Sequence, residues 1–152
     1  MTLTYRQEYA DAVEGELPKV SLVQEWLAGE LGRIRLERDL PSAEYKLMAH
    51  CTEKTSAAPS LKQWQQIFDA LGQKLTIQSA GCCGMSGTFG HETANYKRSK
   101  DIYDLSWRTI VNKPEHRGQL MATGYSCRSQ VKRMDEQSLP HPVQVLLDLI
   151  RQ

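Results

Sequence analysis

The sequence lacks a long apolar run, an excess of charge of one sign and any internal repeat. No stretch approaches the ~20 apolar residues that a membrane span needs, so no spanning segment is expected. Nineteen basic residues against eighteen acidic ones leave a net charge of +1, which argues against a nucleic-acid partner and against a polybasic membrane surface. The first residues carry no apolar stretch after a basic one, so no secretory signal is recognised and a cytoplasmic location is expected.

Motifs that bind phosphate groups are also missing. A phosphate loop of the common type requires a Lys-Ser or Lys-Thr pair that enters a helix, and a dinucleotide fold requires Gly-x-Gly-x-x-Gly near its first strand. Neither pattern occurs in the chain. Its 152 residues, of which 40% are hydrophobic and 24% charged, are typical of one globular domain. A single domain over 1–152 is therefore expected.

Strand-like and helical stretches alternate along the chain. Short strands are predicted over 45–49, 75–79 and 119–123. Helices are predicted where apolar residues recur every three or four positions, over 21–34, 60–71 and 96–112, from Pro142 onwards, and around Tyr5, Tyr9 and Val13. A short helix is also expected to start near 124–127. This alternation is typical of an α/β fold, in which right-handed crossovers place parallel strands in one sheet.

Three further features of the helices can be predicted. Ser21 and Ser60 each open a capping-box pattern at the start of a helix. Leu105 falls on the apolar face of the helix predicted over 96–112. The tryptophans occupy helical core positions, so they are expected to pack in the interior rather than to contact a cofactor: Trp26, Trp64 and Trp107.

Every cysteine follows a predicted strand: Cys51, the adjacent pair Cys82 and Cys83, and Cys127. We expect a parallel sheet of three to four short strands covered by helices. Because the carboxyl ends of parallel strands meet at one edge, all four cysteines are expected at the carboxyl edge of the sheet, where open α/β folds build their sites.

Four thiols at one edge favour a metal or redox site. Disulfides are disfavoured in a reducing compartment, and Cys82 cannot easily pair with Cys83 without strain. Thiolates from several strand ends suit an iron–sulfur cluster or tetrahedral zinc, and a helix that starts near Cys127 would favour its thiolate form. Two other interpretations stay open: a thiol enzyme with Cys82 or Cys83 as nucleophile, and four small buried hydrophobic residues.

Glycine recurs at every third position around the adjacent cysteines, at Gly81, Gly84, Gly87 and Gly90. Glycines there let the backbone pass close to the cysteine sulfurs and point its amides at them, which tunes a cluster. The alternative is a tight turn that requires positive φ.

Histidines and charged residues near the cysteines are weaker candidates. His50 could pair with the cysteine that follows it for nucleophilic catalysis, although neighbours at a strand end usually point to opposite sides. Glu53 and Lys54 could orient the site, but a solvated charge pair is the simpler interpretation. His116 and His141 lie beside loop signals and are expected to be solvated or to cap helices.

The cysteine segments together resemble a known family. Segments 50–55, 81–90 and 124–130 read HCTEKT, GCCGMSGTFG and GYSCRSQ. They resemble the cysteine-rich CCG domain of heterodisulfide reductase subunits, of glycolate and lactate oxidase iron–sulfur subunits and of anaerobic glycerol-3-phosphate dehydrogenase. They look closer still to one branch, the large FAD-linked oxidoreductase of the bacterial D-2-hydroxyglutarate dehydrogenase type. The resemblance covers nearly the whole chain.

This resemblance implies an iron–sulfur domain that transfers electrons in an FAD-linked 2-hydroxyacid dehydrogenase. It implies that the four cysteines are metal ligands, of a 4Fe-4S cluster or of zinc. It also implies that further residues contact the cofactor: Gly81, Gly84, Gly87 and His50. The flavin domain and other iron–sulfur domains of the same polypeptide would be the partners, with FAD bound outside this chain. The chain would be a C-terminal fragment, inactive alone.

One departure from the family pattern affects the kind of cluster. The family pattern often ends in Cys-x-x-Cys, but here Gly124 stands at the first of these positions and Cys127 at the second. Four thiolates rather than five weaken the case for an unusual non-cubane cluster. A structural zinc module and a thiol/disulfide oxidoreductase of the heterodisulfide-reductase type remain the alternatives.

Overall fold

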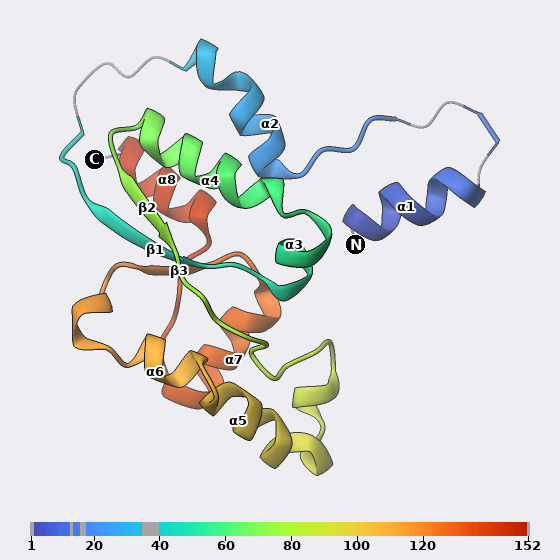
Figure 1. Ribbon diagram of the computed structural model, residues 1–152, viewed down its shortest axis with the longest axis vertical. Coiled ribbons are helices and arrows are strands. Elements are labelled where there is room, and N and C mark those ends of the chain that lie inside the picture. Colours follow the sequence, from blue (N-terminus) through green and yellow to red (C-terminus); the bar gives the residue numbers. More distant parts are fainter. Residues whose placement is uncertain (1, 13, 16–17, 35–39, 152) are drawn as a thin grey trace.

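The centre of the fold is a parallel sheet. The computed structural model describes residues 2–12, 14–15, 18–34 and 40–151 (Figure 1). Within them it forms three strands, in the order β2-β1-β3: β1 (Glu44–Met48), β2 (Lys74–Ile77) and β3 (Leu120–Ala122). In the central strand, Leu47 pairs with Ile77 on one side and with Met121 on the other. The predicted α/β class and parallel sheet are confirmed.

Successive residues of the strands point to opposite faces of the sheet, which produces two cores. Leu47 of β1 and Met121 of β3 pack into the first core, together with Trp64 and Phe68. Their neighbours point the other way and build the second core: Met48, Leu120 and Ala122, with Cys83, Tyr103, Trp107, Cys127 and Val131. Two of the four cysteines are therefore part of the packed interior.

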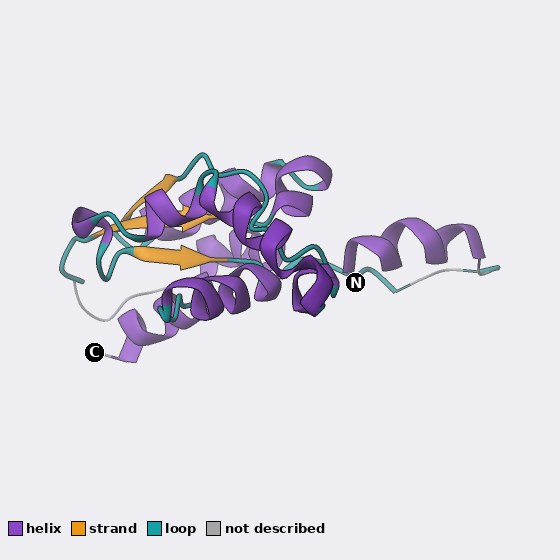
Figure 2. Cartoon of the chain, turned by 90° about the horizontal axis from the view of Figure 1, so that it is seen from below, coloured by secondary structure: helices purple, strands orange, loops and turns teal. Residues whose placement is uncertain are grey.

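Helices cover both faces of the sheet (Figures 1 and 2). The first core is covered by α2 (Val23–Glu30), α4 (Pro59–Ala70) and α8 (Pro142–Arg151). The second is covered by α5 (Tyr96–Asp104), α6 (Trp107–Val111) and α7 (Tyr125–Asp135). The remaining helical segments are α1 (Thr2–Ala12), α3 (Cys51–Ser56) and four short 3-10 turns, Leu31–Arg33, Phe89–His91, Thr93–Asn95 and Pro114–His116. No helix in the described part of the chain is long and apolar enough to cross a membrane.

The first helix of the first core starts and faces differently from the prediction. α2 begins at Val23, and the Glu25 carboxylate accepts from the Leu22 amide at 2.8 Å, so Ser21 does not cap it. Trp26 is 59% exposed, whereas Gln24 is buried. The predicted core position of Trp26 is wrong because the helix turns a neighbouring face, with Leu27, towards the sheet.

The second predicted capping box is also wrong. α4 begins at Pro59, a favoured first-turn residue, rather than being capped by Ser60. Ser60 is 2% exposed and donates a hydrogen bond to the Glu53 carboxylate instead. Trp64, one turn further along, is 1% exposed as expected.

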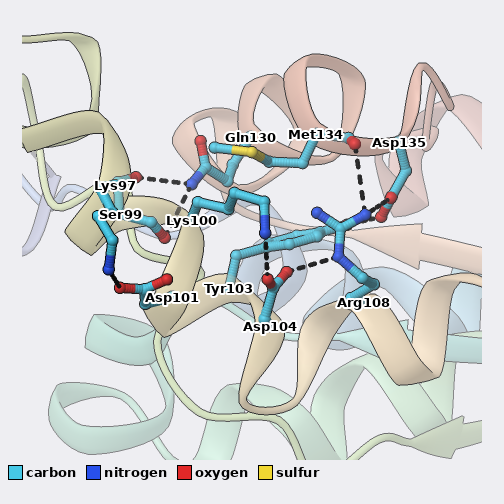
Figure 3. Close-up of polar contacts among 10 residues, drawn as sticks. All are labelled: Lys97, Ser99, Lys100, Asp101, Tyr103, Asp104, Arg108, Gln130, Met134 and Asp135. Atoms are coloured by element: carbon cyan, nitrogen blue, oxygen red, sulfur yellow. Dashed lines mark hydrogen bonds and ion pairs between the residues drawn. The ribbon is translucent and has the colours of Figure 1, made fainter. Parts of the chain in front are cut away.

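The helix predicted over 96–112 is broken into α5 and α6. Leu105 lies at the break and is 83% exposed, so its predicted burial is wrong. Across the break, Arg108 is paired with Asp104 of α5 and with Asp135 of α7 (Figure 3). Tyr103 donates its hydroxyl hydrogen bond to Asp135 as well. This network ties the three helices of the second core together.

The ends of the chain follow the prediction in part. α1 includes Tyr5 and Tyr9, whose rings stack with centroids 4.6 Å apart, while Val13 lies outside the described residues. Arg6 ties α1 to α2 through the Val20 carbonyl and Glu25. α8 begins at Pro142 as predicted. α3 was not predicted, and α7 is a full helix of 11 residues rather than a short one.

Candidate metal centre

The four cysteines lie at one edge of the sheet. All three strands leave the sheet on the same side (Figure 1). Cys51 is the first residue of α3, three positions after the end of β1, and Cys127 lies in the first turn of α7, which follows β3. Cys82 and Cys83 lie in the loop that follows β2. The predicted position of the cysteines at the carboxyl edge is confirmed.

Neighbouring thiols influence one another's pKa values along a row. Cys82 interacts with Cys51 and with Cys83, and Cys83 interacts with Cys127. None of them forms a disulfide. Cys83 and Cys127 are 4% and 1% exposed, whereas Cys82 is exposed at the surface. The row therefore runs from the interior of the second core to solvent.

The two buried thiols, Cys83 and Cys127, have pKa values that are shifted in opposite directions. The Cys127 thiol donates to the Cys83 sulfur, and the amide of Met85 points at the same sulfur, which together lower the pKa of Cys83 to about 7. The same hydrogen bond, with burial and the charge on Cys83, raises the pKa of Cys127. The expected preference for thiolate at Cys127 is therefore not found in the chain without bound metal. Burial also raises the pKa of Cys82.

The glycine loop holds its shape through positive φ angles and close contacts. Gly84 has φ +84°, and its amide donates to the Cys82 sulfur at 3.3 Å. A Cβ at Gly84 would lie 2.2 Å from the carbonyl oxygen of Ser99. Gly87 has φ +65°, but a Cβ there would meet nothing within 4 Å. Gly84 therefore meets both expectations, since its amide points at a cysteine sulfur and its φ is positive. Gly87 meets only the expectation of a turn that requires positive φ.

Buried polar groups support this loop from behind. The Ser99 hydroxyl donates to the Gly84 carbonyl at 2.8 Å. Gln130 of α7 in turn donates to the Ser99 hydroxyl at 2.8 Å, as Figure 3 shows. Ser99 and Gln130 are both 0% exposed. Gln130 lies three residues after Cys127 on α7 and so joins the loop to the helix that carries the last thiol. At the other end of the loop, Ser106 accepts from the Gly81 amide at 3.0 Å.

His50 lies between α3 and α7. Its Nδ1 accepts from the Thr52 amide at 3.2 Å, so it caps the start of α3. A Cβ built on Gly124 would lie 2.5 Å from the His50 ring and 2.8 Å from the Cys127 sulfur. Gly124 is thus required because the imidazole and the buried thiol share the space beside it. Burial lowers the pKa of His50, which keeps the ring neutral near this site.

Glu53 and Lys54 do not form the solvated pair that the sequence favoured. The Glu53 carboxylate accepts hydrogen bonds from Ser60, from the Trp64 indole at 3.1 Å and from Thr123. Lys54 donates to the Ala80 carbonyl, just before the glycine loop. Sequence reasoning missed the role of Glu53 because its donors come from α4 and from the end of β3, far away in the chain.

Two further histidines, His116 and His141, differ from each other. His116 is 6% exposed and its Nδ1 bonds the Ile110 carbonyl at 2.8 Å, so the expectation of a solvated residue is wrong. His141 accepts from the Val143 amide at 3.2 Å and therefore caps the start of α8. Its ring also packs edge-on against Trp64, with centroids 5.8 Å apart.

The groups available at this edge to hold a metal ion or a cluster are the four thiols and the nearby backbone amides. Among the described residues, no three side chains of His, Cys, Asp or Glu lie together in the arrangement of a site for one metal ion. The chemistry of the edge nevertheless fits a soft metal or an iron–sulfur cluster, which takes thiolate ligands and hydrogen bonds to sulfur. Four free thiols lie at this edge, and backbone amides point at Cys82 and Cys83.

The sequence of the chain is similar to part of several curated dehydrogenases. The chain is 50% identical over 151 residues to D-2-hydroxyglutarate dehydrogenase of Pseudomonas putida, an alignment that covers 97% of this chain and 14% of that protein. It is 42% identical to the enzymes of the same name from Haemophilus influenzae and Escherichia coli, over 99% of this chain and 16% and 15% of theirs. These matches confirm the resemblance to the D-2-hydroxyglutarate dehydrogenase type. No family model and no solved structure matches the chain.

Nearly all of this chain aligns with the curated relatives, but the chain spans only about one seventh of their length. The chain is therefore similar to one domain-sized part of these dehydrogenases.

Proposed function

We propose that this chain holds an iron–sulfur cluster through Cys51, Cys82, Cys83 and Cys127 and transfers electrons within an oxidoreductase of the D-2-hydroxyglutarate dehydrogenase type. The observation that carries the proposal is that all four cysteines lie at the carboxyl edge of the sheet, where neighbouring thiols interact. A protein that used these residues only for packing would have no reason to gather all four thiols at one edge, one of them at the surface.

The surroundings of the thiols support this role. The pKa of about 7 at Cys83 makes its thiolate available near neutral pH, which a ligand of iron or zinc requires. The Gly84 amide bonds the Cys82 sulfur, and such hydrogen bonds tune the potential of a cluster. Gly81 and Gly87 shape the same loop, and His50 lies against the Cys127 side of the site.

An iron–sulfur cluster bound here would supply one-electron transfer. Cys82 is the exposed member of the row, so electrons would enter or leave on its side, while Cys83 and Cys127 exclude water from the other side. In this proposal FAD and the 2-hydroxyacid substrate, D-2-hydroxyglutarate, bind in other domains of a longer polypeptide. The partners of this chain are then those flavin and iron–sulfur domains.

Metal analysis of the anaerobically prepared chain tests the proposal. We expect a brown protein with iron and sulfide bound after reconstitution, and an electron paramagnetic resonance signal after reduction. Cys83→Ser should lose most of the iron, because a site with four thiolates has no spare ligand. Cys82→Ser should behave in the same way, whereas Thr52→Ser, a matched change of one methyl group beside Cys51, should keep full iron.

The outcomes separate the candidate roles of the cysteines. A colourless protein with one zinc per chain would replace the cluster by a zinc centre. Full iron in the Cys83→Ser protein would remove this residue from the ligand set. A wild-type chain that binds neither iron nor zinc after anaerobic reconstitution would contradict the metal-binding proposal altogether.

A further inference from the structure

A hydrogen-bonded bracket crosses the sheet edge directly behind the cysteines. The Glu53 carboxylate uses one oxygen to accept from Ser60 and from the Trp64 indole, and the other to accept from Thr123. The Thr123 hydroxyl in turn accepts from the His50 amide at 2.9 Å. Four elements are joined in this way: the end of β1, the first turn of α3, the start of α4 and the end of β3.

The bracket connects the two outer members of the thiol row. His50 immediately precedes Cys51, and Glu53 follows it by two residues in the same turn of α3. Thr123 is followed by Gly124 and then by α7, whose first turn carries Cys127. Beyond the last strand pair at Met48 and Ala122, two contacts join the segments after β1 and β3. The His50 amide donates to the Thr123 hydroxyl at 2.9 Å, and the His50 ring lies beside Gly124 with its Nε2 3.5 Å from the Ser126 hydroxyl. The Thr123 contacts are the shorter of the two and act on the backbone next to Cys51, so they restrict where Cys51 lies relative to Cys127.

We propose that Glu53 and Thr123 are positioning residues of the metal centre, which hold Cys51 and Cys127 at the spacing that the bound cluster requires. This inference rests on the proposed function. Neither residue is a ligand in this proposal: both Glu53 oxygens are occupied by donors from α4 and from the end of β3, and Glu53 acts through the backbone that carries Cys51.

The chemistry of the bracket favours positioning over stability alone. A partly buried carboxylate and hydroxyl make up a polar network in a place where apolar side chains would pack without a desolvation cost. Such a network restricts the relative positions of the groups that it joins, because a hydrogen bond is favourable only over a limited range of distances and angles. Around metal sites, groups that orient the ligands typically govern metal retention as strongly as stability.

Iron retention after anaerobic reconstitution tests the proposal in the 152-residue chain. We expect Thr123→Val to lose iron to a competing chelator about 10-fold faster than the wild type, since groups that orient ligands typically contribute about 10-fold or more to metal retention. Its electron paramagnetic resonance spectrum after reduction should also change. Thr123→Ser, which keeps the hydroxyl, should restore both. Glu53→Gln should resemble Thr123→Val, because the amide nitrogen cannot accept a hydrogen bond and at least one of the three donors loses its acceptor.

A matched control separates positioning from a general loss of stability. Gln73 is also a buried polar residue, but it lies just before β2, at the opposite edge of the sheet from the cysteines, and accepts from the Ala43 amide at 3.0 Å. Gln73→Met should lower the midpoint of urea unfolding, because buried backbone groups lose their partner, without changing iron loss or the spectrum. If Thr123→Val keeps the wild-type rate of iron loss and spectrum, or if Gln73→Met changes both equally, the positioning role is overturned.

A second measurement keeps this result distinct from failure of the proposed function. In the metal-free Cys82→Ser/Cys83→Ser chain, hydrogen peroxide is small enough to oxidise the half-buried Cys51, whose sulfur Cys127 then attacks, so that one peroxide bridges the two remaining thiols in a disulfide and releases two waters. Adding Thr123→Val should slow this bridging if the bracket sets their spacing. A wild-type chain that binds no metal contradicts the proposed function, whereas bridging that Thr123→Val leaves unchanged contradicts the bracket.

Discussion

Gly84 is the residue at which the cysteine loop has the least freedom. Its φ of +84° is unfavourable for any residue with a side chain, and a Cβ would lie 2.2 Å from the Ser99 carbonyl oxygen, which belongs to the backbone of α5. The flexible end of a side chain could move away, but helix backbone cannot do so without a shift of the loop or of α5. The amide that bonds the Cys82 sulfur would move with the loop.

We predict that Gly84→Ala lowers the free energy of unfolding by about 3 kcal/mol, through backbone strain and overpacking. Gly87→Ala is the matched control, because its φ of +65° is similar but a Cβ there meets nothing within 4 Å. It should cost about 1 kcal/mol, the price of a left-handed conformation alone. Urea unfolding of both variants measures the difference. Equal losses would show that the contact with Ser99 does not restrict the loop.

Tyr103 makes the second core sensitive to alkaline pH. Burial, followed by its hydrogen bond to Asp135, raises its pKa well above the ordinary value. The folded state therefore keeps the phenol proton at a pH where the unfolded chain has lost it. The stability from this group is complete below about pH 10, the value for an unfolded tyrosine, and decreases as the pH rises further.

We predict that the free energy of unfolding falls less steeply above about pH 10 in Tyr103→Phe than in the wild type, because the titrating group is gone. Below that pH the variant should be less stable, since Asp135 loses one hydrogen-bond donor and keeps Arg108. Urea unfolding measured at a series of pH values gives both slopes. Parallel curves for the two proteins above pH 10 would contradict the shift at Tyr103.

Residues of the candidate site differ in how far the sequence reveals them. The cysteines could be placed because each follows a strand and parallel strands end at a common edge. Glu53 and Thr123 could not, because a carboxylate and a hydroxyl have no periodicity that marks their partners. Their hydrogen bond joins positions 70 residues apart, and only the assembled sheet brings them together.

Among the elements, α2 shows the limit of periodicity as a guide to burial. Its apolar residues occupy more than one face, so the pattern alone does not select the face that meets the sheet. The structure buries Gln24 and packs Leu27 and Ala28 on the first core, which leaves Trp26 at the surface. α4 is more sharply amphipathic, and its predicted core residues Trp64, Ile67 and Phe68 are all buried.

We predict that the two tryptophans contribute very differently to stability. Trp64→Ala should lower the free energy of unfolding by about 3–5 kcal/mol, as for other large aromatic residues removed from a core. Trp26→Ala should change it by about 0.5 kcal/mol or less, as is usual at exposed positions. Urea unfolding of the two variants tests this. If Trp26→Ala lowered the free energy of unfolding as much as Trp64→Ala, Trp26 would have to lie in the core, as the sequence pattern predicts.

The break between α5 and α6 could not be predicted either. Apolar residues continue at helical spacing through Leu105, and no proline or glycine interrupts them. The break depends on tertiary contacts: the Ser106 hydroxyl accepts from the Gly81 amide, and the Trp107 indole donates to the Gly81 carbonyl at 3.0 Å. The break between the two helices thus lets Ser106 and Trp107 anchor the loop that carries Cys82 and Cys83.

At the scale of the whole molecule, the fold was predictable because the pattern of elements restricts the topology strongly. Strands of period 2 separated by helices lead to parallel pairs with right-handed crossovers, and the three strands then end at one edge. In the order β2-β1-β3, the strand that leads to Cys51 lies between the strands that lead to the other thiols. The position of the site follows from this order, while its exact contacts depend on side chains packed from both faces.

The same architecture leads to a prediction about activity. The carboxyl edge of the sheet carries thiols where a nucleotide-binding fold would carry a glycine-rich phosphate loop that enters a helix. Oxidation of a 2-hydroxyacid by hydride removal requires an organic cofactor such as a flavin. The chain also spans only 14–16% of the length of its relatives named D-2-hydroxyglutarate dehydrogenase.

We therefore predict that the 152-residue chain, supplied with D-2-hydroxyglutarate, FAD and an artificial electron acceptor, shows no turnover above a protein-free control. Once reconstituted with iron and sulfide, the same preparation should still accept electrons from a chemical reductant, which shows that the thiol site is intact in the inactive chain. Acceptor reduction followed by absorbance measures the first, and bleaching of the visible band measures the second. Turnover that disappears in Cys82→Ser would mean that the oxidation begins at the thiols, and the electron-transfer proposal would then have to be abandoned.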